Sequence, residues 1–175
     1  LMYTAQLPDR GPFVIRYPRG ASEHPDWQSP MREVPIGKAR LLREINAKDS
    51  GKPIAILTIG PIGNVAARAI DRTTNVSLRH YDMRFLKPID ESLLHDIADT
   101  CAYIITIEDG ARNGGLGTAV AEYMAEHHHP ITVTRLGLPD TFVTHGTVPE
   151  LRRLVGIDED SILAQIQAAA TNTAN

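Results

Sequence analysis

The stretch PIAILTIGPIGNVAARAIDRTTNVSLRHYD, residues 53–82, decides the fold. Residues 53–59 form an apolar run of strand length, which predicts a strand buried on both faces of a sheet. Residues 60–64 contain two glycines and a proline that turn the chain, and residues 76–82 have the composition of a second strand. Between them, four apolar residues recur at helical spacing: Val65, Ala66, Ala69 and Ile70. The stretch therefore predicts a βαβ unit, whose strands are parallel and whose crossover is right-handed.

The same alternation extends to both sides of this unit. Further strands are expected at residues 39–44, 103–107 and 131–135. Further helices are expected at 91–101 after an Asp90 cap, from the glycine-rich turn 114–117 to about residue 126, at 148–155 and at 159–169. Strands that alternate with helices predict an α/β fold, with an open, mostly parallel sheet and helices on both faces.

The chain divides into three regions of different composition. Residues 36–175 carry the regular alternation and form the main domain. Residues 21–35 are rich in proline and polar residues and predict a linker, which Trp27 and Met31 could anchor against a surface. Residues 1–20 begin with what resembles the end of a helix, followed by a polar turn.

Composition narrows the class of protein. The 175 residues are 42% hydrophobic, which is enough for a globular core, and the net charge of −3 has no basic stripe of the kind that nucleic acids require. No apolar stretch approaches the roughly 20 residues that span a bilayer, and no signal segment begins the sequence. We therefore expect a cytoplasmic protein without nucleic-acid or membrane partners. Cys101 stands alone, which predicts a buried thiol and neither a disulfide nor a cysteine-based metal site.

Two arginines stand close together in the segment RYPRG, residues 16–20. The preceding apolar run Phe13–Ile15 predicts a short strand that delivers Arg16. Pro18 restricts φ and the closing glycine lets the backbone turn away, so Arg19 is held on a stiff edge. A planar guanidinium held in this way suits bidentate binding of phosphate or carboxylate. The alternative is that both arginines pair with local acids or face water.

Two adjacent carboxylates, Glu108 and Asp109, follow a predicted strand and precede the glycine-rich turn 114–117. The glycines fit neither the dinucleotide nor the phosphate-loop spacing, so we interpret them as permitting a tight turn and close helix packing. Acid–base work or metal binding would be open to the carboxylates, but adjacent strand residues point to opposite faces. A capping or subunit-interface role is favoured.

Histidines offer two further candidates. His127, His128 and His129 end a predicted helix and are expected to project in different directions, which disfavours metal binding. His145 lies in a loop, where it could carry a proton or contact a substrate. The favoured interpretation is a histidine bonded to nearby backbone, before Thr147 caps the next helix.

Charged residues also surround the turn after residue 82. Arg84 and Lys87 could meet the acids of a partner, or form solvated pairs with Asp82 and Asp90.

Five blocks of sequence occur in a recognisable order: RYPRG, PIGKA, DMRFLKPID, EDGARNGGLG and GLPDTFVTHGT. In this order and at these separations they resemble the C-terminal part of the 1-deoxy-D-xylulose-5-phosphate synthase family. The resemblance implies a transketolase-type C-terminal domain at 36–175, a linker at 21–35, and the tail of a pyrimidine-binding domain, with its last strand, at 1–20. Where other members have Glu-Glu-Asn, this chain has Glu-Asp-Gly at 108–110, which weakens any side-chain role for the third position.

The resemblance also implies an activity. Such enzymes use thiamine diphosphate and Mg²⁺ to condense pyruvate with D-glyceraldehyde 3-phosphate, on the way to isoprenoids and thiamine, and the full-length protein is expected to be a homodimer. Arg19 matches the arginine that contacts the acceptor phosphate. No catalytic, cofactor-binding or metal-binding residue carries over, so the chain alone is expected to be inactive and to hold no cofactor. The alternative is a non-catalytic dimerisation or binding subunit of a split transketolase-like enzyme.

Overall fold

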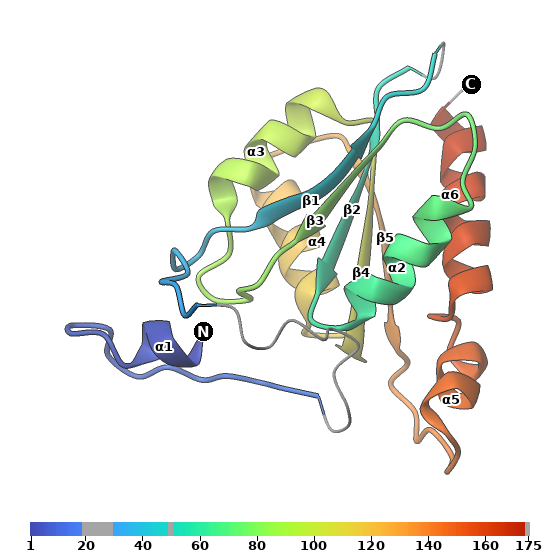
Figure 1. Cartoon of the computed structure of the whole chain (residues 1–175). Coiled ribbons are helices and arrows are strands. Elements are labelled where there is room, and N and C mark those ends of the chain that lie inside the picture. The colour runs from blue at the N-terminus through green and yellow to red at the C-terminus, as the bar shows by residue number, and fades with distance from the viewer. Residues whose placement is uncertain (19–29, 49–50, 174–175) are drawn as a thin grey trace.

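The computed structural model describes residues 1–18, 30–48 and 51–173, and its centre is one five-stranded sheet (Figure 1). The strands are β1 (Arg40–Ile45), β2 (Ile54–Ile59), β3 (Leu78–Asp82), β4 (Tyr103–Ala111) and β5 (Thr132–Leu138), and they lie in the order β1-β3-β2-β4-β5. The strands β3, β2, β4 and β5 are parallel, and β1 pairs antiparallel with β3 at one edge. The prediction of an open, mostly parallel sheet is confirmed.

Helices cover both faces of the sheet, as expected. The helices α2 (Ile62–Asp71) and α6 (Glu159–Thr173) pack against each other and against β2 and β4 on one face. The helices α3 (Glu91–Thr100) and α4 (Leu116–Glu126) lie together on the other face. Two short helices complete the fold, α1 (Met2–Ala5) and α5 (Val148–Leu154). None of the helices in the described ranges is both long and apolar enough to cross a membrane.

The central strand β2 is buried on both sides. Ile54 and Ile56 contribute to the core beneath α2 and α6, whereas Ala55 and Leu57 contribute to the core beneath α3 and α4. This alternation follows from the two-residue period of a strand, and it explains why the sequence of β2 is apolar at every position of the run.

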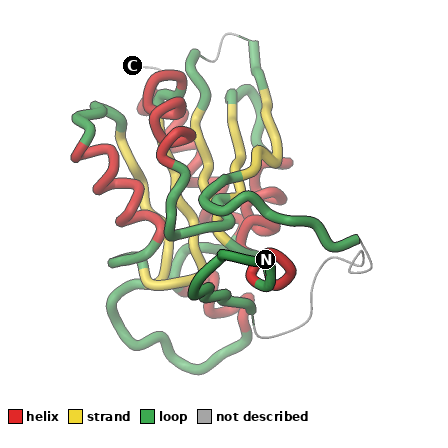
Figure 2. Tube along the Cα trace, turned by 90° about the vertical axis from the view of Figure 1, so that its left-hand side faces the viewer, coloured by secondary structure: helices red, strands yellow, loops and turns green. Residues whose placement is uncertain are grey.

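The strand order fixes where a functional site is expected. After β2 the chain crosses to β3 on one side, and after β3 it crosses back to β4 on the other side of β2. In open α/β sheets, ligands bind beyond the carboxyl ends of the strands at such a switch point. The carboxyl ends of β2 and β4 are at the lower end of the sheet in Figure 1, and the N-terminal segment, residues 1–18, lies at that end too (Figure 2).

The short strand predicted at Phe13–Ile15 is wrong. Residues 11–18 form no regular secondary structure, although the run is apolar. A strand needs a neighbour for its backbone N–H and C=O groups, and none of the five described strands pairs with this segment. The local pattern was right for a strand, but the pairing partner was missing.

The described end of the predicted linker, residues 30–35, is attached by polar contacts. Glu33 forms an ion pair with Arg10, and the backbone N–H of Val34 donates to the hydroxyl of the buried Thr4 over 2.8 Å. The anchoring role expected for Met31 is wrong, because its side chain is 80% exposed. The other expected anchor, Trp27, lies outside the described residues.

Candidate functional site

The buried carboxylate at the end of β4 caps helix α4. Glu108 Oε2 accepts the backbone N–H of Leu116, and Oε1 accepts that of Gly117, each over 3.0 Å. These N–H groups are free at the start of a helix, where the helix dipole also favours negative charge. The capping role predicted for Glu108 is confirmed, and the carboxylate occupies the place where a doubly wound fold offers a phosphate its N–H groups.

The glycines of the turn permit this close approach. A Cβ on Gly115 would clash with Glu108 Oε2, and a Cβ on Gly117 would lie 2.6 Å from Thr106 Oγ1. These positions need glycine for packing and not to cradle a ligand. The interpretation of the turn as a packing device is therefore confirmed.

The second carboxylate, Asp109, points away from Glu108. Its Oδ2 accepts a hydrogen bond from Arg152 Nη2 of α5 over 2.9 Å. This ion pair ties the end of β4 to α5, so both carboxylates of the pair have structural partners. The sequence gave no local signal for Arg152, since 43 positions separate the two residues.

The N-terminal segment reaches the same end of the sheet. The ring of Phe13 meets that of Phe85, after β3, edge to face with centroids 6.0 Å apart. Arg16 Nη1 lies 3.7 Å, and Glu108 Oε2 3.5 Å, from the position that a Cβ on Gly110 would take. Arg16 therefore lies beside the end of β4, next to the switch point. Arg19 lies outside the described residues, so its role stays a prediction.

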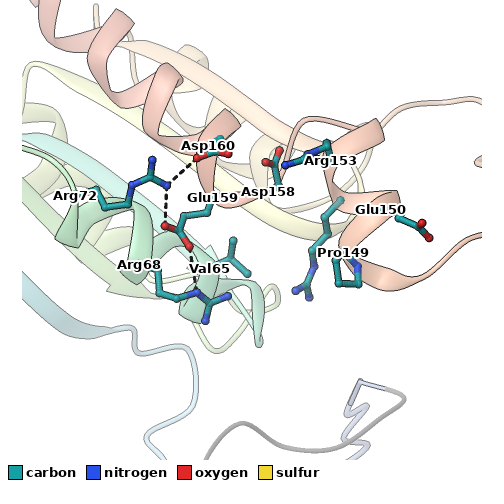
Figure 3. A pocket seen from close by; sticks show the side chains of 10 residues that line it. Val65, Arg68, Arg72, Pro149, Glu150, Arg153, Asp158, Glu159 and Asp160 are labelled. Atoms are coloured by element: carbon teal, nitrogen blue, oxygen red, sulfur yellow. Dashed lines mark hydrogen bonds and ion pairs between the residues drawn. The ribbon is translucent and has the colours of Figure 1, made fainter.

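A groove of about 540 Å³ runs between α2, α5 and α6, and arginines and acids line it (Figure 3). Arg72 donates to Glu159 and to Asp160, each over 2.8 Å, and Arg68 pairs with Glu159 over 3.4 Å. These side chains largely neutralise each other, so the groove is not an anion site.

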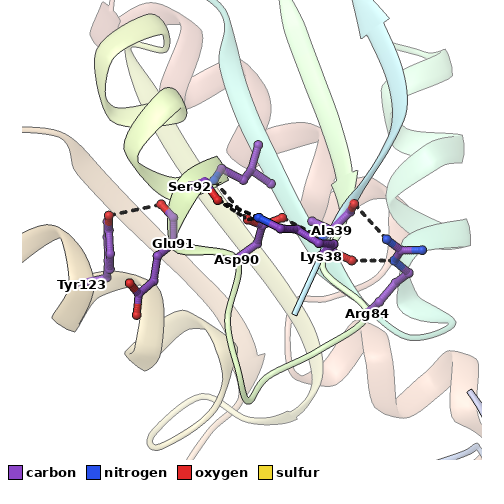
Figure 4. A network of polar contacts seen from close by, with 8 residues as sticks. Lys38, Ala39, Arg84, Asp90, Glu91, Ser92 and Tyr123 are labelled. Atoms are coloured by element: carbon purple, nitrogen blue, oxygen red, sulfur yellow. Dashed lines mark hydrogen bonds and ion pairs between the residues drawn. The ribbon is translucent and has the colours of Figure 1, made fainter. Parts of the chain in front are cut away.

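The blocks PIGKA and DMRFLKPID form one polar network (Figure 4). Asp90 accepts from Lys38 Nζ over 2.9 Å and from the backbone N–H of Ala39 over 3.0 Å, while it also caps α3 through Leu93. Burial alone would raise the pKa of Asp90, but these hydrogen bonds hold that pKa below its usual value.

Arg84 completes this network in a way that the sequence did not indicate. Its guanidinium donates to the carbonyl oxygens of Lys38 and Ala39, over 2.8 and 3.0 Å. The proposed side-chain pairs of Arg84 with Asp82 or Asp90 are wrong, because those acids are bonded to Arg40 and Lys38. Lys87 is exposed and has no acidic partner in the part of the chain that the structure describes.

The histidines at the end of α4 form an aromatic stack. The ring of His127 stacks on Tyr123 with centroids 4.1 Å apart, and His129 meets His95 of α3. The expectation that the rings project in different directions is wrong for His127 and His129, whose planes differ by 14°. Within the described ranges, no three metal-ligating side chains are arranged to hold an ion.

His145 is exposed at the carboxyl end of the sheet, in the loop after β5. The backbone bond expected for it is wrong, since its ring makes no hydrogen bond with the described residues. The expected cap is confirmed: Thr147 begins α5, and Glu150 accepts hydrogen bonds from its backbone N–H and hydroxyl, over 2.9 and 2.7 Å.

Comparisons with known proteins agree with this geometry. The model of the family "Transketolase, C-terminal domain" matches residues 43–162. The chain is 54% identical over 169 residues to the 1-deoxy-D-xylulose-5-phosphate synthase of Bacteroides thetaiotaomicron, and 52% identical over 165 residues to that of Phocaeicola vulgatus. These alignments cover 95% and 93% of this chain but only 25% of each relative, so the chain spans about a quarter of their length.

A solved structure shares the fold. It is described as "Split gene transketolase, inactive beta4 tetramer", and it superimposes with a TM-score of 0.70 at 32% sequence identity. The match covers 82% of this chain and 45% of that one. From the sheet order, the capped α4 and the family match, we conclude that this chain belongs to the transketolase C-terminal domain family.

Proposed function

We propose that the chain is the C-terminal part of a 1-deoxy-D-xylulose-5-phosphate synthase. Such a transketolase-type transferase uses thiamine diphosphate to condense pyruvate with D-glyceraldehyde 3-phosphate, which yields 1-deoxy-D-xylulose 5-phosphate and CO₂ for isoprenoid and thiamine precursors. The observation that carries the proposal is the 54% identity to a curated relative of that name over 95% of the chain. The cytoplasmic location and the homodimer expected from the sequence stay predictions.

The chain contributes to this enzyme without providing its cofactor site. Glu108 and Asp109 are the acids nearest to the switch point, and they are bonded to the start of α4 and to Arg152. Neither is free to ligate Mg²⁺ or to move a proton. Residues of the described ranges therefore do not fit a site for thiamine diphosphate, which supplies the electron sink for decarboxylation when it is bound. The remainder of the longer protein would hold it.

The contribution that we assign to this chain is Arg19, as a contact for the phosphate of the aldehyde acceptor. Its neighbour Arg16 lies beside Gly110 at the end of β4, which supports the assignment because ligands bind at this end of an open sheet. A guanidinium binds a phosphate dianion through two parallel hydrogen bonds, so it would discriminate the phosphorylated acceptor from pyruvate.

Steady-state kinetics of the full-length synthase tests this role. Arg19→Ala should raise the KM for glyceraldehyde 3-phosphate about 10- to 100-fold, the range expected for a lost charged hydrogen bond, and leave the KM for pyruvate unchanged. Arg10→Ala is the matched control, since that arginine of the same segment pairs with Glu33 and should affect neither KM. Equal losses for both substrates would refute the phosphate contact.

A second candidate is a separate, non-catalytic subunit of a split transketolase-like enzyme. The likeness to a split-gene transketolase, 32% identical and in an inactive tetramer, favours it. The reading frame upstream of this sequence distinguishes the two: a continuous frame with a metal- and diphosphate-binding motif supports the synthase, whereas a start codon and a separate gene support the subunit.

A further inference from the structure

Large apolar side chains that remain exposed gather at one end of the molecule. In the loop after β5 and in α5, Phe142 is fully exposed, and Val148 and Leu154 are 54% and 64% exposed. At the start of β1, Leu41 pairs with Tyr81 near the carboxyl end of β3, and its side chain is 49% exposed. Within the described ranges, the helices α2, α3, α4 and α6 carry no exposed large apolar residue. Four helices therefore present a finished polar surface, and the carboxyl end of the sheet does not.

An apolar groove lies within this surface. It has a volume of about 190 Å³ between the end of β5 and α5, beside the Asp109–Arg152 ion pair. Its apolar lining comes mainly from five side chains: Leu138, Val143, Val148, Leu151 and Val155. A contiguous apolar patch of this kind on a water-soluble domain marks an interaction site.

The N-terminal segment already crosses this end of the sheet. Phe13 packs on Phe85 and Arg16 lies beside Gly110, so the segment runs from the end of β3 to the end of β4. Yet Val14 and Tyr17 of the same segment are 91% and 79% exposed. The segment thus covers part of the surface and adds exposed apolar groups of its own.

Charge gives the rim of this surface a sign. Three exposed cations at the carboxyl end, Arg16, Lys87 and Arg112, have no acidic partner in the part of the chain that the structure describes. A fitting partner has an apolar centre that fills the groove and acidic residues around it.

We infer that the carboxyl end of the sheet, with the 139–147 loop and α5, docks the preceding part of the same, longer polypeptide. This inference rests on the proposed function, in which this chain is the last quarter of a synthase. Residues 1–18 would then be the covalent edge of that partner, already in contact with the surface. A tethered partner binds at high effective concentration, so a modest apolar patch is enough to hold it.

Thiol labelling of single-cysteine replacements tests the inference, because the native Cys101 is buried and its burial raises the pKa of the thiol. Phe142→Cys and Leu154→Cys are made both in the chain alone and in the full-length protein. Labelling at both positions should be at least tenfold slower in the full-length protein. Ala168→Cys, on the exposed face of α6, is the control and should be labelled at the same rate in both proteins.

Two outcomes would overturn the inference. Equal labelling rates at 142 in the two proteins would show that nothing covers the patch. Slow labelling already in the chain alone, together with a dimer mass in sedimentation, would assign the patch to a second copy. Labelling needs no turnover, so it can fail while the acceptor kinetics of Arg19→Ala succeed, and the two proposals are tested separately.

Discussion

At the scale of single residues, the most perturbed group is a histidine that is far from any exposed surface. His80 of β3 is 1% exposed, and its Nε2 lies 3.0 Å from Thr58 Oγ1. The Thr58 hydroxyl donates its hydrogen to the carbonyl oxygen of Tyr81, so it accepts from His80 and fixes the neutral tautomer with hydrogen on Nε2. Burial, with a smaller contribution from the Arg43 charge, lowers the pKa of His80 to about 4.

This pKa predicts how stability depends on pH. The unfolded chain takes up a proton at His80 near pH 6.5, whereas the folded chain does so only near pH 4, so stability is lost as pH falls between these values. The loss attributable to this residue approaches about 3 kcal/mol, because each pKa unit is worth about 1.4 kcal/mol. Urea unfolding at about pH 7.5 and about pH 4.5 measures it.

The control for this prediction is a variant without the titrating ring. His80→Gln should be less stable at neutral pH but should lose about 3 kcal/mol less than the native chain between the two pH values. The same pH dependence in both proteins would mean that other groups cause it.

At the scale of an element, α4 depends on a carboxylate that the sheet supplies. Its N-cap position is Gly115, which has no capping side chain, and Glu108 replaces that side chain from the neighbouring strand. Glu108→Ala should lower the free energy of unfolding by about 2–3 kcal/mol, because two buried N–H groups lose their acceptor. Urea denaturation of the chain measures this loss.

Asp109→Asn is the matched control for the cap. It changes a neighbouring carboxylate whose ion pair with Arg152 is partly exposed, and such pairs contribute at most about 1 kcal/mol. If Glu108→Ala cost no more than Asp109→Asn, the cap would not be a main support of α4.

The elements themselves were largely predictable, because their signals are local. The apolar run at 53–59 and the helical spacing of Val65 to Ile70 lie in the sequence, and β2 and α2 follow from them. The predicted strand at 103–107 extends in the structure to Ala111, past the polar residues that cap α4 and bind α5. The strand expected at 13–15 failed for the opposite reason, since its local pattern found no partner.

At the scale of the whole molecule, contacts between distant segments set the limit of prediction. The capping role of Glu108 was predictable, because its partners are eight and nine positions away in the turn that follows. The bonds of Arg84 to the 38–39 carbonyls cross 45 and 46 positions, and no periodicity indicates such contacts. The polar network of Asp90 became visible only when the fold brought PIGKA and DMRFLKPID together.

The whole-molecule proposal makes a prediction about the chain alone. If the acceptor site is shared between Arg19 and the rest of a synthase, the chain alone should bind glyceraldehyde 3-phosphate too weakly to detect, because one arginine cannot offset the entropy of capturing a small ligand. A ligand at 100 times its Kd would stabilise the fold by about 2.7 kcal/mol, which raises the Tm of a domain of this size by several degrees. Thermal unfolding with and without millimolar ligand should therefore show no shift for the chain and a clear one for the full-length protein. A shift of several degrees in the chain alone would mean that its own residues complete a phosphate site, and the shared-site proposal would have to be abandoned.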